Sequence, residues 1–220
     1  MLRAGIPTAS AMDRIVTKSG KDSSQAEKYR FLLLAERIMG RPIEDKRFTW
    51  SMERGSILEK KALQYYRFET DYETTAAGFI TDDLERWGAS PDQFVGEKGL
   101  LEVKCPEIDA HIGYLMKVGS AYEDYKVQAQ AQLWICEREW VDFLSYHPDL
   151  PWSLVRVERD DRFIGLLSKA VRTFSDELEL LSIQAKERGW FRLDSVRQPQ
   201  ESEQDRMVRA MKESLIELKG

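Results

Sequence analysis

The sequence contains little cysteine and little histidine. Its two cysteines, Cys105 and Cys136, stand far apart in the 220 residues and form no CxxC pair. They indicate neither a disulfide framework nor a zinc ribbon, and one chain cannot hold a four-cysteine iron–sulfur cluster. The two histidines, His111 and His147, are isolated and lack the context of a zinc or ββα-metal site, so we interpret both as structural.

Long hydrophobic runs are also missing. No apolar stretch approaches the roughly 18 to 20 residues that a membrane-spanning helix needs. The N-terminus lacks the basic and then apolar order of a signal peptide. We therefore expect no membrane partner and a cytoplasmic location in a bacterial host cell.

There is no excess of positive charge. The chain has 33 Lys and Arg against 38 Asp and Glu, and its net charge is −5. This argues against a protein that binds nucleic acid over its whole surface, but not against a nuclease, whose metal site is itself acidic. One locally basic stretch, Lys18, Lys21, Lys28 and Arg30, could face DNA or could simply be a solvated loop and helix face.

What is present is the composition of a packed domain, with 42% hydrophobic residues. Apolar residues recur at helical spacing in four segments, and short runs rich in Gly, Thr and aromatic residues read as strands. We predict an α/β fold with a central mixed sheet flanked by helices. Residues 1–190 form a single domain in this interpretation, and 191–220 form a linker and a helical tail. The expected helices cover 25–39, 50–68, 121–137 and 161–188, and the expected strands cover 77–81, 92–95, 99–105, 140–147 and 152–158.

The most informative stretch is Ser90-Pro91-Asp92, followed after nine residues by Leu101-Glu102-Val103-Lys104-Cys105-Pro106. Side chains alternate along a strand, so Glu102 and Lys104 project to the same side, about 7 Å apart. Asp92 can reach them if its strand forms a hairpin with theirs around residues 96–99. Two converging carboxylates suit Mg²⁺, and a lysine can polarise the attacking water. Taken alone, the Glu-x-Lys pair could equally be a solvated ion pair.

These residues resemble the PD-(D/E)XK nuclease signature, in the version of the phage lambda exonuclease (YqaJ-type) family. The likeness extends over about residues 2–190. It includes 2–10 (Leu-Arg-Ala-Gly-Ile-Pro-Thr-Ala-Ser), Arg54-Gly55 with Glu59, and 125–130 (Tyr-Lys-Val-Gln-Ala-Gln) with Trp134. One departure is that Gln93 follows Asp92, where the family usually has Gly.

The resemblance implies a restriction-endonuclease-like core and a metal-dependent active site. Asp92 and Glu102 would bind Mg²⁺, as two ions, and Mn²⁺ could replace Mg²⁺. The Val103 backbone carbonyl would add a ligand, Lys104 would act at the nucleophile, and Glu59 would serve the metal site. Gln128 and Tyr125, one turn apart on a helix, would support these groups.

The N-terminal motif has a physical interpretation of its own. Arg3 offers a planar fork suited to phosphate, and Thr8 and Ser10 place hydroxyls at a predicted helix N-terminus, either as simple caps or as anion ligands. The resemblance implies a pocket for the 5′-phosphate of duplex DNA. It therefore implies a 5′→3′ exonuclease that leaves a 3′ single strand for recombination by strand annealing. It further implies a ring-shaped homotrimer and a single-strand annealing protein as partner.

Two alternatives remain at this stage. The chain could be another PD-(D/E)XK nuclease, either a restriction-like endonuclease or a RecB-type enzyme. It could also be a catalytically silent DNA-binding module. The joint presence of Asp92, Glu102, Lys104 and Gln128 disfavours the silent module, which would be free to lose any of them.

Overall fold

A computed structural model describes residues 3–43, 49–117 and 120–191, with backbone alone for 49–57, 120 and 121. Leu2 of the N-terminal motif, the side chain of Arg54 and the predicted tail at 192–220 lie outside this description. No helix in the described part is long and apolar enough to cross a membrane.

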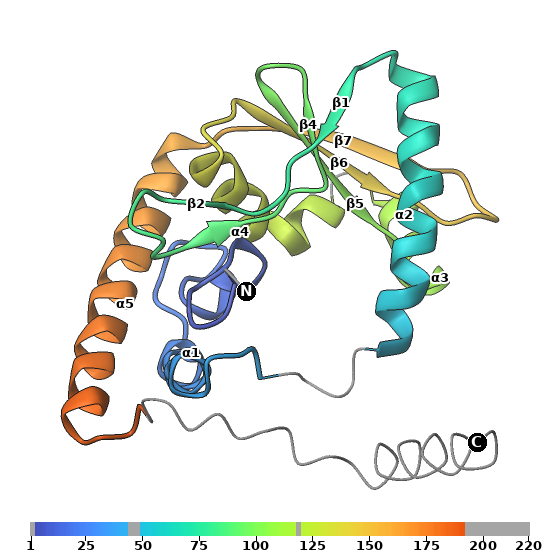
Figure 1. The fold of residues 1–220 in the computed structure, drawn as a ribbon. Helices are drawn as coiled ribbons and strands as arrows, with labels where there is room; N and C mark the ends of the chain where they lie inside the picture. Colours follow the sequence, from blue (N-terminus) through green and yellow to red (C-terminus); the bar gives the residue numbers. More distant parts are fainter. Residues whose placement is uncertain (1–2, 44–48, 118–119, 192–220) are drawn as a thin grey trace, which may run out of the picture.

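The centre of the fold is a sheet of five strands in the order β1-β4-β5-β6-β7 (Figure 1). Strands β5 and β6 run parallel, and every other neighbouring pair is antiparallel, which confirms the predicted mixed sheet. A separate pair, β2 with β3, is antiparallel. The strands are β1 (Thr74–Ala76), β2 (Ile80–Thr81), β3 (Gly88–Ala89), β4 (Gln93–Val95), β5 (Gly99–Lys104), β6 (Trp140–Ser145) and β7 (Ser153–Glu158).

Helices cover both faces of this sheet. They are α1 (Ala26–Met39), α2 (Thr49–Thr70), α3 (Ile108–Met116), α4 (Ser120–Ile135) and α5 (Asp161–Glu187), preceded by a 3-10 helix, η1 (Ala9–Arg14). On one face, Ala62 and Tyr66 of α2 pack against Leu101 and Val103 of β5. On the other face, Leu100 joins a larger core with α4, α5 and η1. In Figure 1, α2 and α5 stand on opposite sides of the molecule.

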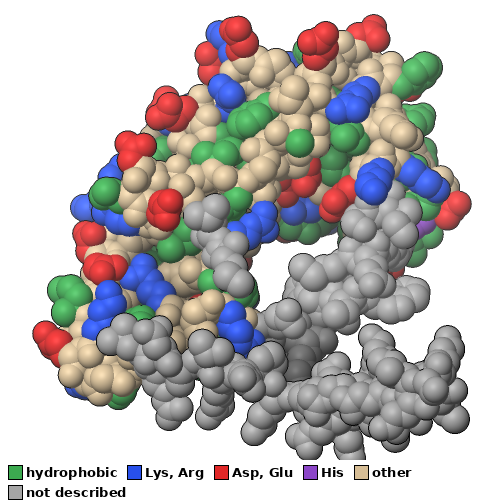
Figure 2. Space-filling view, in the orientation of Figure 1, with side chains coloured by type: hydrophobic (Ala, Val, Ile, Leu, Met, Phe, Trp, Pro, Cys, Tyr) green, Lys and Arg blue, Asp and Glu red, His purple; other side chains and the backbone are tan. Residues whose placement is uncertain are grey.

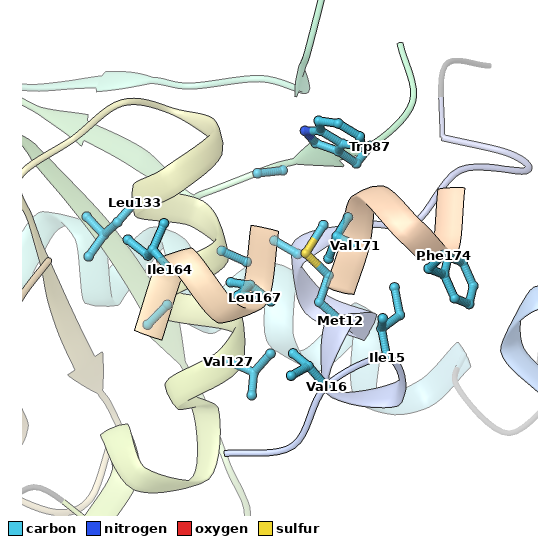
Figure 3. Close-up of a cluster of buried hydrophobic side chains, with 14 of the residues drawn as sticks. Met12, Ile15, Val16, Trp87, Val127, Leu133, Ile164, Leu167, Val171 and Phe174 are labelled. Carbon is cyan, nitrogen blue, oxygen red and sulfur yellow. The ribbon is translucent and has the colours of Figure 1, made fainter. Parts of the chain in front are cut away.

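The long helix α5 forms much of the larger core. Its buried side chains recur at three and four residues, so one stripe of the helix faces inward. Asp160 caps its start, because a side-chain oxygen of Asp160 accepts the Phe163 N–H. Figure 3 shows Ile164, Leu167 and Val171 of this stripe lying beside Met12 and Val16 of the N-terminal segment and Val127 of α4. The predicted helix over 161–188 is confirmed almost to the residue.

A buried carboxylate and its partners stabilise the α2 face of the sheet. Asp142 of β6 accepts two hydrogen bonds of 2.8 Å from the Arg156 guanidinium of β7. The same carboxylate accepts a 2.7 Å hydrogen bond from the Tyr66 hydroxyl of α2. A buried carboxylate needs such partners to offset its lost hydration. The three residues therefore tie the helix to the two strands.

Some local expectations were wrong. Helix α3 was not predicted, because nine residues between a proline and a second helix give too short a pattern. The predicted strand 77–81 is shorter, at Ile80–Thr81, and β1 precedes it. The predicted strand 92–95 begins at Gln93.

His111 and His147 are both buried with their rings 6.0 Å apart, and the two His111 ring nitrogens bond Ser145 and the Pro151 carbonyl.

Candidate active site

Glu102 and Lys104 meet at the end of β5, as strand alternation predicts. The Lys104 ammonium donates a 2.7 Å hydrogen bond to Glu102 Oε1. Glu102 is buried and Lys104 is largely so. The neighbours Leu101 and Val103 point to the opposite face, into the α2 cluster. This pair is therefore not the solvated surface ion pair that Glu-x-Lys could have been.

Asp92 reaches the same place through the predicted hairpin. Strands β4 and β5 are antiparallel, and Gln93 lies opposite Leu101, so Asp92 comes opposite Glu102 just beyond the paired residues. Asp92 Oδ2 accepts a 2.6 Å hydrogen bond from the Val103 N–H. In a strand, the N–H and C=O of one residue point to the same edge. The Val103 carbonyl consequently faces the side on which Asp92 lies.

Two glutamines of α4 complete the hydrogen bonding around Glu102. The Gln128 amide donates a short hydrogen bond to Glu102 Oε1, and the Gln132 amide donates one of 2.7 Å to Glu102 Oε2. Gln128 also accepts a 3.3 Å hydrogen bond from Lys104. The ring centroid of Tyr125 lies 4.8 Å from the Lys104 ammonium nitrogen. Tyr125 has non-helical dihedrals, which place a kink in α4 beside the lysine.

The pKa values of Asp92 and Lys104 are both shifted upward in this site. Burial, together with the nearby charge of Glu102, raises the pKa of Asp92 to about 7. The Val103 N–H and Lys104 offset only part of that rise. Burial by itself would lower the pKa of Lys104, but the bonded Glu102 carboxylate outweighs it and the pKa is raised. Lys104 is thus held as a cation beside carboxylates that repel each other.

The residues present fit a divalent cation. A carboxylate whose proton affinity is raised by burial and by a neighbouring carboxylate is an environment in which an added cation is favourable, and hard oxygen donors suit Mg²⁺ or Mn²⁺. Asp92, Glu102 and the Val103 carbonyl converge here. Glu59 is exposed on α2, and its charge contributes to the raised pKa of Asp92. Among the described residues, no three acidic, histidine or cysteine side chains form a ready cluster.

The N-terminal loop brings Arg3 to the same region. The Arg3 guanidinium donates a 2.6 Å hydrogen bond to the Ser90 hydroxyl and lies 5.0 Å from the centroid of the Phe79 ring. Ser90 is two residues from Asp92, so the arginine is anchored on the segment that carries Asp92. The loop itself is held by α1. The Gly5 N–H donates to Glu36 and its carbonyl accepts from the Arg37 guanidinium.

Thr8 and Ser10 are adjacent but do not cap a helix through their side chains. Their hydroxyl oxygens lie 3.3 Å apart, and no side-chain cap bond forms at Thr8. The predicted helix here is the six-residue 3-10 helix η1, too short to supply a helix dipole of any size. The dipole of a long helix is therefore not available for anion binding at this place.

A single cavity of about 440 Å³ joins the two predicted sites. Arg3, Thr8 and Ser10 line it together with Ser90, Asp92, Gln128 and Gln132. In the space-filling view, acidic and basic side chains lie close together near the middle of the molecule (Figure 2).

Sequence reasoning missed two residues of this site. Ser90 stood inside the quoted motif, but nothing in the sequence indicated that it would bind Arg3. Gln132 lies four residues after Gln128 on the same helix, and that i, i+4 spacing was the signal that could have revealed it.

Comparison with known proteins agrees with this geometry. The family model of the YqaJ-like viral recombinase domain matches residues 1–139. A search of curated proteins gave no match. The chain is similar to the alkaline exonuclease LHK-Exo from Laribacter hongkongensis, solved alone and with dAMP, at 33% identity and a TM-score of 0.75, covering 85% of this chain and 94% of that one. A phage-related exonuclease from Haemophilus somnus shares the fold, with a TM-score of 0.63, 14% identity, and 81% and 96% covered.

The expected resemblance and the expected PD-(D/E)XK type of core are confirmed by these matches. The family model covers more than half of the chain, and the similarity to LHK-Exo extends through most of both proteins. The chain belongs to the YqaJ-like viral recombinase family.

Proposed function

We propose that this protein is a Mg²⁺-dependent exonuclease that degrades linear double-stranded DNA in the 5′→3′ direction from 5′-phosphorylated ends. The observation that carries the proposal is the shared cavity. Asp92 and Gln128 line the same cavity as Arg3, Thr8 and Ser10. Gln128 in turn bonds both Glu102 and Lys104. An end-bound phosphate and a scissile phosphate can therefore be held in one site.

The reaction would be hydrolysis of the phosphodiester nearest the 5′ end. Water attacks the phosphorus, the bond from phosphorus to the 3′ oxygen breaks, and that oxygen takes up a proton. Asp92, Glu102 and the Val103 carbonyl would hold Mg²⁺, which would supply Lewis-acid stabilisation and a more acidic bound water. Lys104 would orient the attacking water and stabilise charge on the phosphate, since its raised pKa keeps it cationic.

The remaining side chains would hold these groups in place. Gln128 bonds both Glu102 and Lys104, and the Tyr125 ring lies beside the ammonium. Glu59 would contribute negative charge at the edge of the site rather than a direct ligand. Such prearranged partners reduce the reorganisation needed when charge develops on the phosphate.

Arg3, Thr8 and Ser10 would bind the terminal 5′-phosphate. Arg3 already donates to Ser90, and its planar fork has further N–H groups for a phosphate. The Thr8 and Ser10 hydroxyls lie on the same cavity wall. The dAMP complex of LHK-Exo supports a site for deoxynucleotides in a relative of this chain. Holding the end at a fixed place explains why cleavage would proceed from the terminus.

Family membership also supports a role in recombination. The description of the family as viral recombinases fits an exonuclease that leaves a 3′ single strand for annealing. We propose the same ring-shaped homotrimer and the same kind of partner, a phage-type single-strand annealing protein, that the resemblance implies.

The test is digestion of matched DNA substrates with Mg²⁺. Linear duplexes with or without 5′-phosphates and a covalently closed circle of the same sequence would be compared, with Lys104→Ala as the inactive variant. We expect rapid loss of the phosphorylated linear duplex, survival of the circle and no activity of Lys104→Ala. Cutting of the circle would point to an endonuclease. Failure on every substrate, with DNA still bound, would point to a silent binding module.

A further inference from the structure

We propose that Gln132 is a positioning residue for the active site, fixing the orientation of Glu102 from the side opposite Lys104. This inference rests on the proposed function, because it concerns the residues that would hold the metal ion. No motif in the sequence led to Gln132, and the assignment comes from its contacts.

The first observation is how the Glu102 carboxylate is divided between its partners. Oε1 accepts from both Lys104 and Gln128. Oε2 accepts the 2.7 Å hydrogen bond from Gln132. With both oxygens held, the carboxylate cannot rotate about its terminal bond without losing a hydrogen bond. Gln132 therefore fixes the orientation of the Glu102 carboxylate.

The second observation concerns the other end of the same amide. Gln132 is 1% exposed, and among the described residues its Oε1 has no hydrogen-bond partner. Exchanging the amide oxygen and nitrogen would set an oxygen against Glu102 Oε2, so the hydrogen bond itself assigns the orientation. A buried acceptor without a partner costs free energy, and native proteins rarely keep one without a reason.

The cavity supplies that reason. Gln132 lines it together with Asp92 and Gln128. An acceptor next to a cation site can accept a hydrogen bond from a water molecule held there, as outer-sphere groups do in metal enzymes. Gln132 would thus orient Glu102 with its N–H and orient a water with its carbonyl. It touches no reacting atom in this role.

Helix α4 offers a matched control two residues away. Gln130 is equally buried, but it faces the other way. Its amide nitrogen donates to the Glu158 carbonyl and its oxygen accepts the Asp160 N–H, so it secures the link from β7 to α5. Gln130 and Gln132 therefore separate a structural buried glutamine from one that serves the site.

The experiment is a titration of the full chain with Mn²⁺ in the absence of DNA, in which electron paramagnetic resonance measures the binding. Wild type, Gln132→Met and Gln130→Met would be compared, with thermal unfolding of each metal-free protein. Loss of an outer-sphere partner typically weakens metal binding by about 10- to 100-fold. We expect that loss for Gln132→Met, and wild-type affinity with a lower Tm for Gln130→Met. In DNA digestion, Gln132→Met should lower kcat and leave KM for DNA nearly unchanged.

Wild-type Mn²⁺ affinity in Gln132→Met would overturn the inference, as would an equal loss in both variants. If Gln132→Met does not fold, Gln132→Asn keeps an amide that is too short to reach Glu102, and the same weakening is expected. The titration uses no substrate. If the Mn²⁺ affinity depends on Gln132 but the wild-type protein degrades no DNA, the proposed function is refuted and this inference stands. If the wild-type protein binds no Mn²⁺, both are refuted.

Discussion

The Arg3 guanidinium donates to the Ser90 hydroxyl over 2.6 Å, although the two residues are 87 positions apart in the chain. The Ser90 hydroxyl in turn donates a 2.9 Å hydrogen bond to the Gly78 carbonyl. The contact joins the N-terminal motif to the segment that carries Asp92. If the proposed function is correct, this contact couples recognition of the DNA end to the metal site.

Replacing Arg3 with alanine should remove the preference for 5′-phosphorylated ends. A charge-assisted hydrogen bond contributes about 1.5 to 3 kcal/mol, which corresponds to roughly a 10- to 100-fold change. We expect kcat/KM to fall by that factor on phosphorylated duplex and to change little on 5′-hydroxyl duplex. Equal losses on both substrates would remove the phosphate role from Arg3. Ser90→Ala should give a smaller loss of the same kind.

Gly5 should not tolerate a side chain, because an added Cβ would clash with Arg37. Its φ is +76°, and an added Cβ would lie 2.4 Å from the Arg37 side chain that holds the loop. Gly5→Ala should therefore displace Arg3 and weaken the preference for phosphorylated ends. Gly40 is the matched control, with φ +65° and open space around the added Cβ. Gly40→Ala should cost about 1 to 2 kcal/mol in stability and leave end preference unchanged. Indistinguishable end preferences in the two variants would contradict the argument.

Lys104→Met should lower both kcat and the Tm of the metal-free protein. We expect kcat to fall by roughly 10²- to 10⁴-fold, with DNA binding retained. The metal-free variant should also have a lower Tm, since Asp92 and Glu102 lose a neighbouring positive charge. Added Mg²⁺ should restore more of the Tm than it does in wild type. Lys126→Met is the control on α4, where the ammonium lies over the Phe163 ring away from the site. An unchanged metal-free Tm for Lys104→Met would count against charge compensation.

Asp92 gives a prediction with a definite sign in pH. Its folded pKa of about 7 lies above the value of about 3.9 for an unfolded chain, so the folded state favours the protonated form. Its contribution to stability is therefore full below about pH 4 and is lost as the pH rises to about 7. At about 1.4 kcal/mol per pKa unit, the loss amounts to at most roughly 4 kcal/mol.

Denaturant unfolding in chelator, from pH 4 to pH 8, measures this loss. Asp92→Asn should flatten the profile relative to wild type, while Asp124→Asn at the exposed pair with Lys18 should not. Mg²⁺ binding near pH 6.5 should release a proton from wild type, measured by calorimetry in two buffers of different ionisation enthalpy. Parallel wild-type and Asp92→Asn profiles would show that Asp92 is not the titrating group.

The Tyr66 hydroxyl should matter for stability and not for chemistry. Tyr66→Phe removes a buried hydrogen bond to Asp142, which remains paired with Arg156. The expected loss is about 1 to 2 kcal/mol in the free energy of unfolding. Asp142 lies opposite Leu101, on the α2 face, so kcat of the folded variant should be unchanged. Tyr65→Phe, at a more exposed ring on the same helix, should cost less. A fall in kcat for Tyr66→Phe would show that this face of the sheet reaches the active site.

The sequence by itself determined the main elements and the centre of the site. The apolar periodicity of α1, α4 and α5 comes from local spacing, so their bounds were predictable to within a few residues. Gly40, in a left-handed conformation, ends α1 as expected. Strand alternation placed Glu102 beside Lys104, and the turn at 96–98 brought Asp92 to them. All of these relationships arise between residues that are near one another in the chain.

The tertiary structure decided what depends on contacts between distant segments. The position of Arg3 against Ser90 and the second glutamine on Glu102 both follow from packing of elements far apart in sequence. The helix predicted after Thr8 is the 3-10 helix η1, and Met12 of η1 is buried in the core together with Ile15 and Val16, which follow it. Local spacing cannot specify such docking, because the free energy that selects it comes from burial of surface between elements. Only the packing of η1, α1 and α4 around the end of β5 makes one cavity of the two motifs.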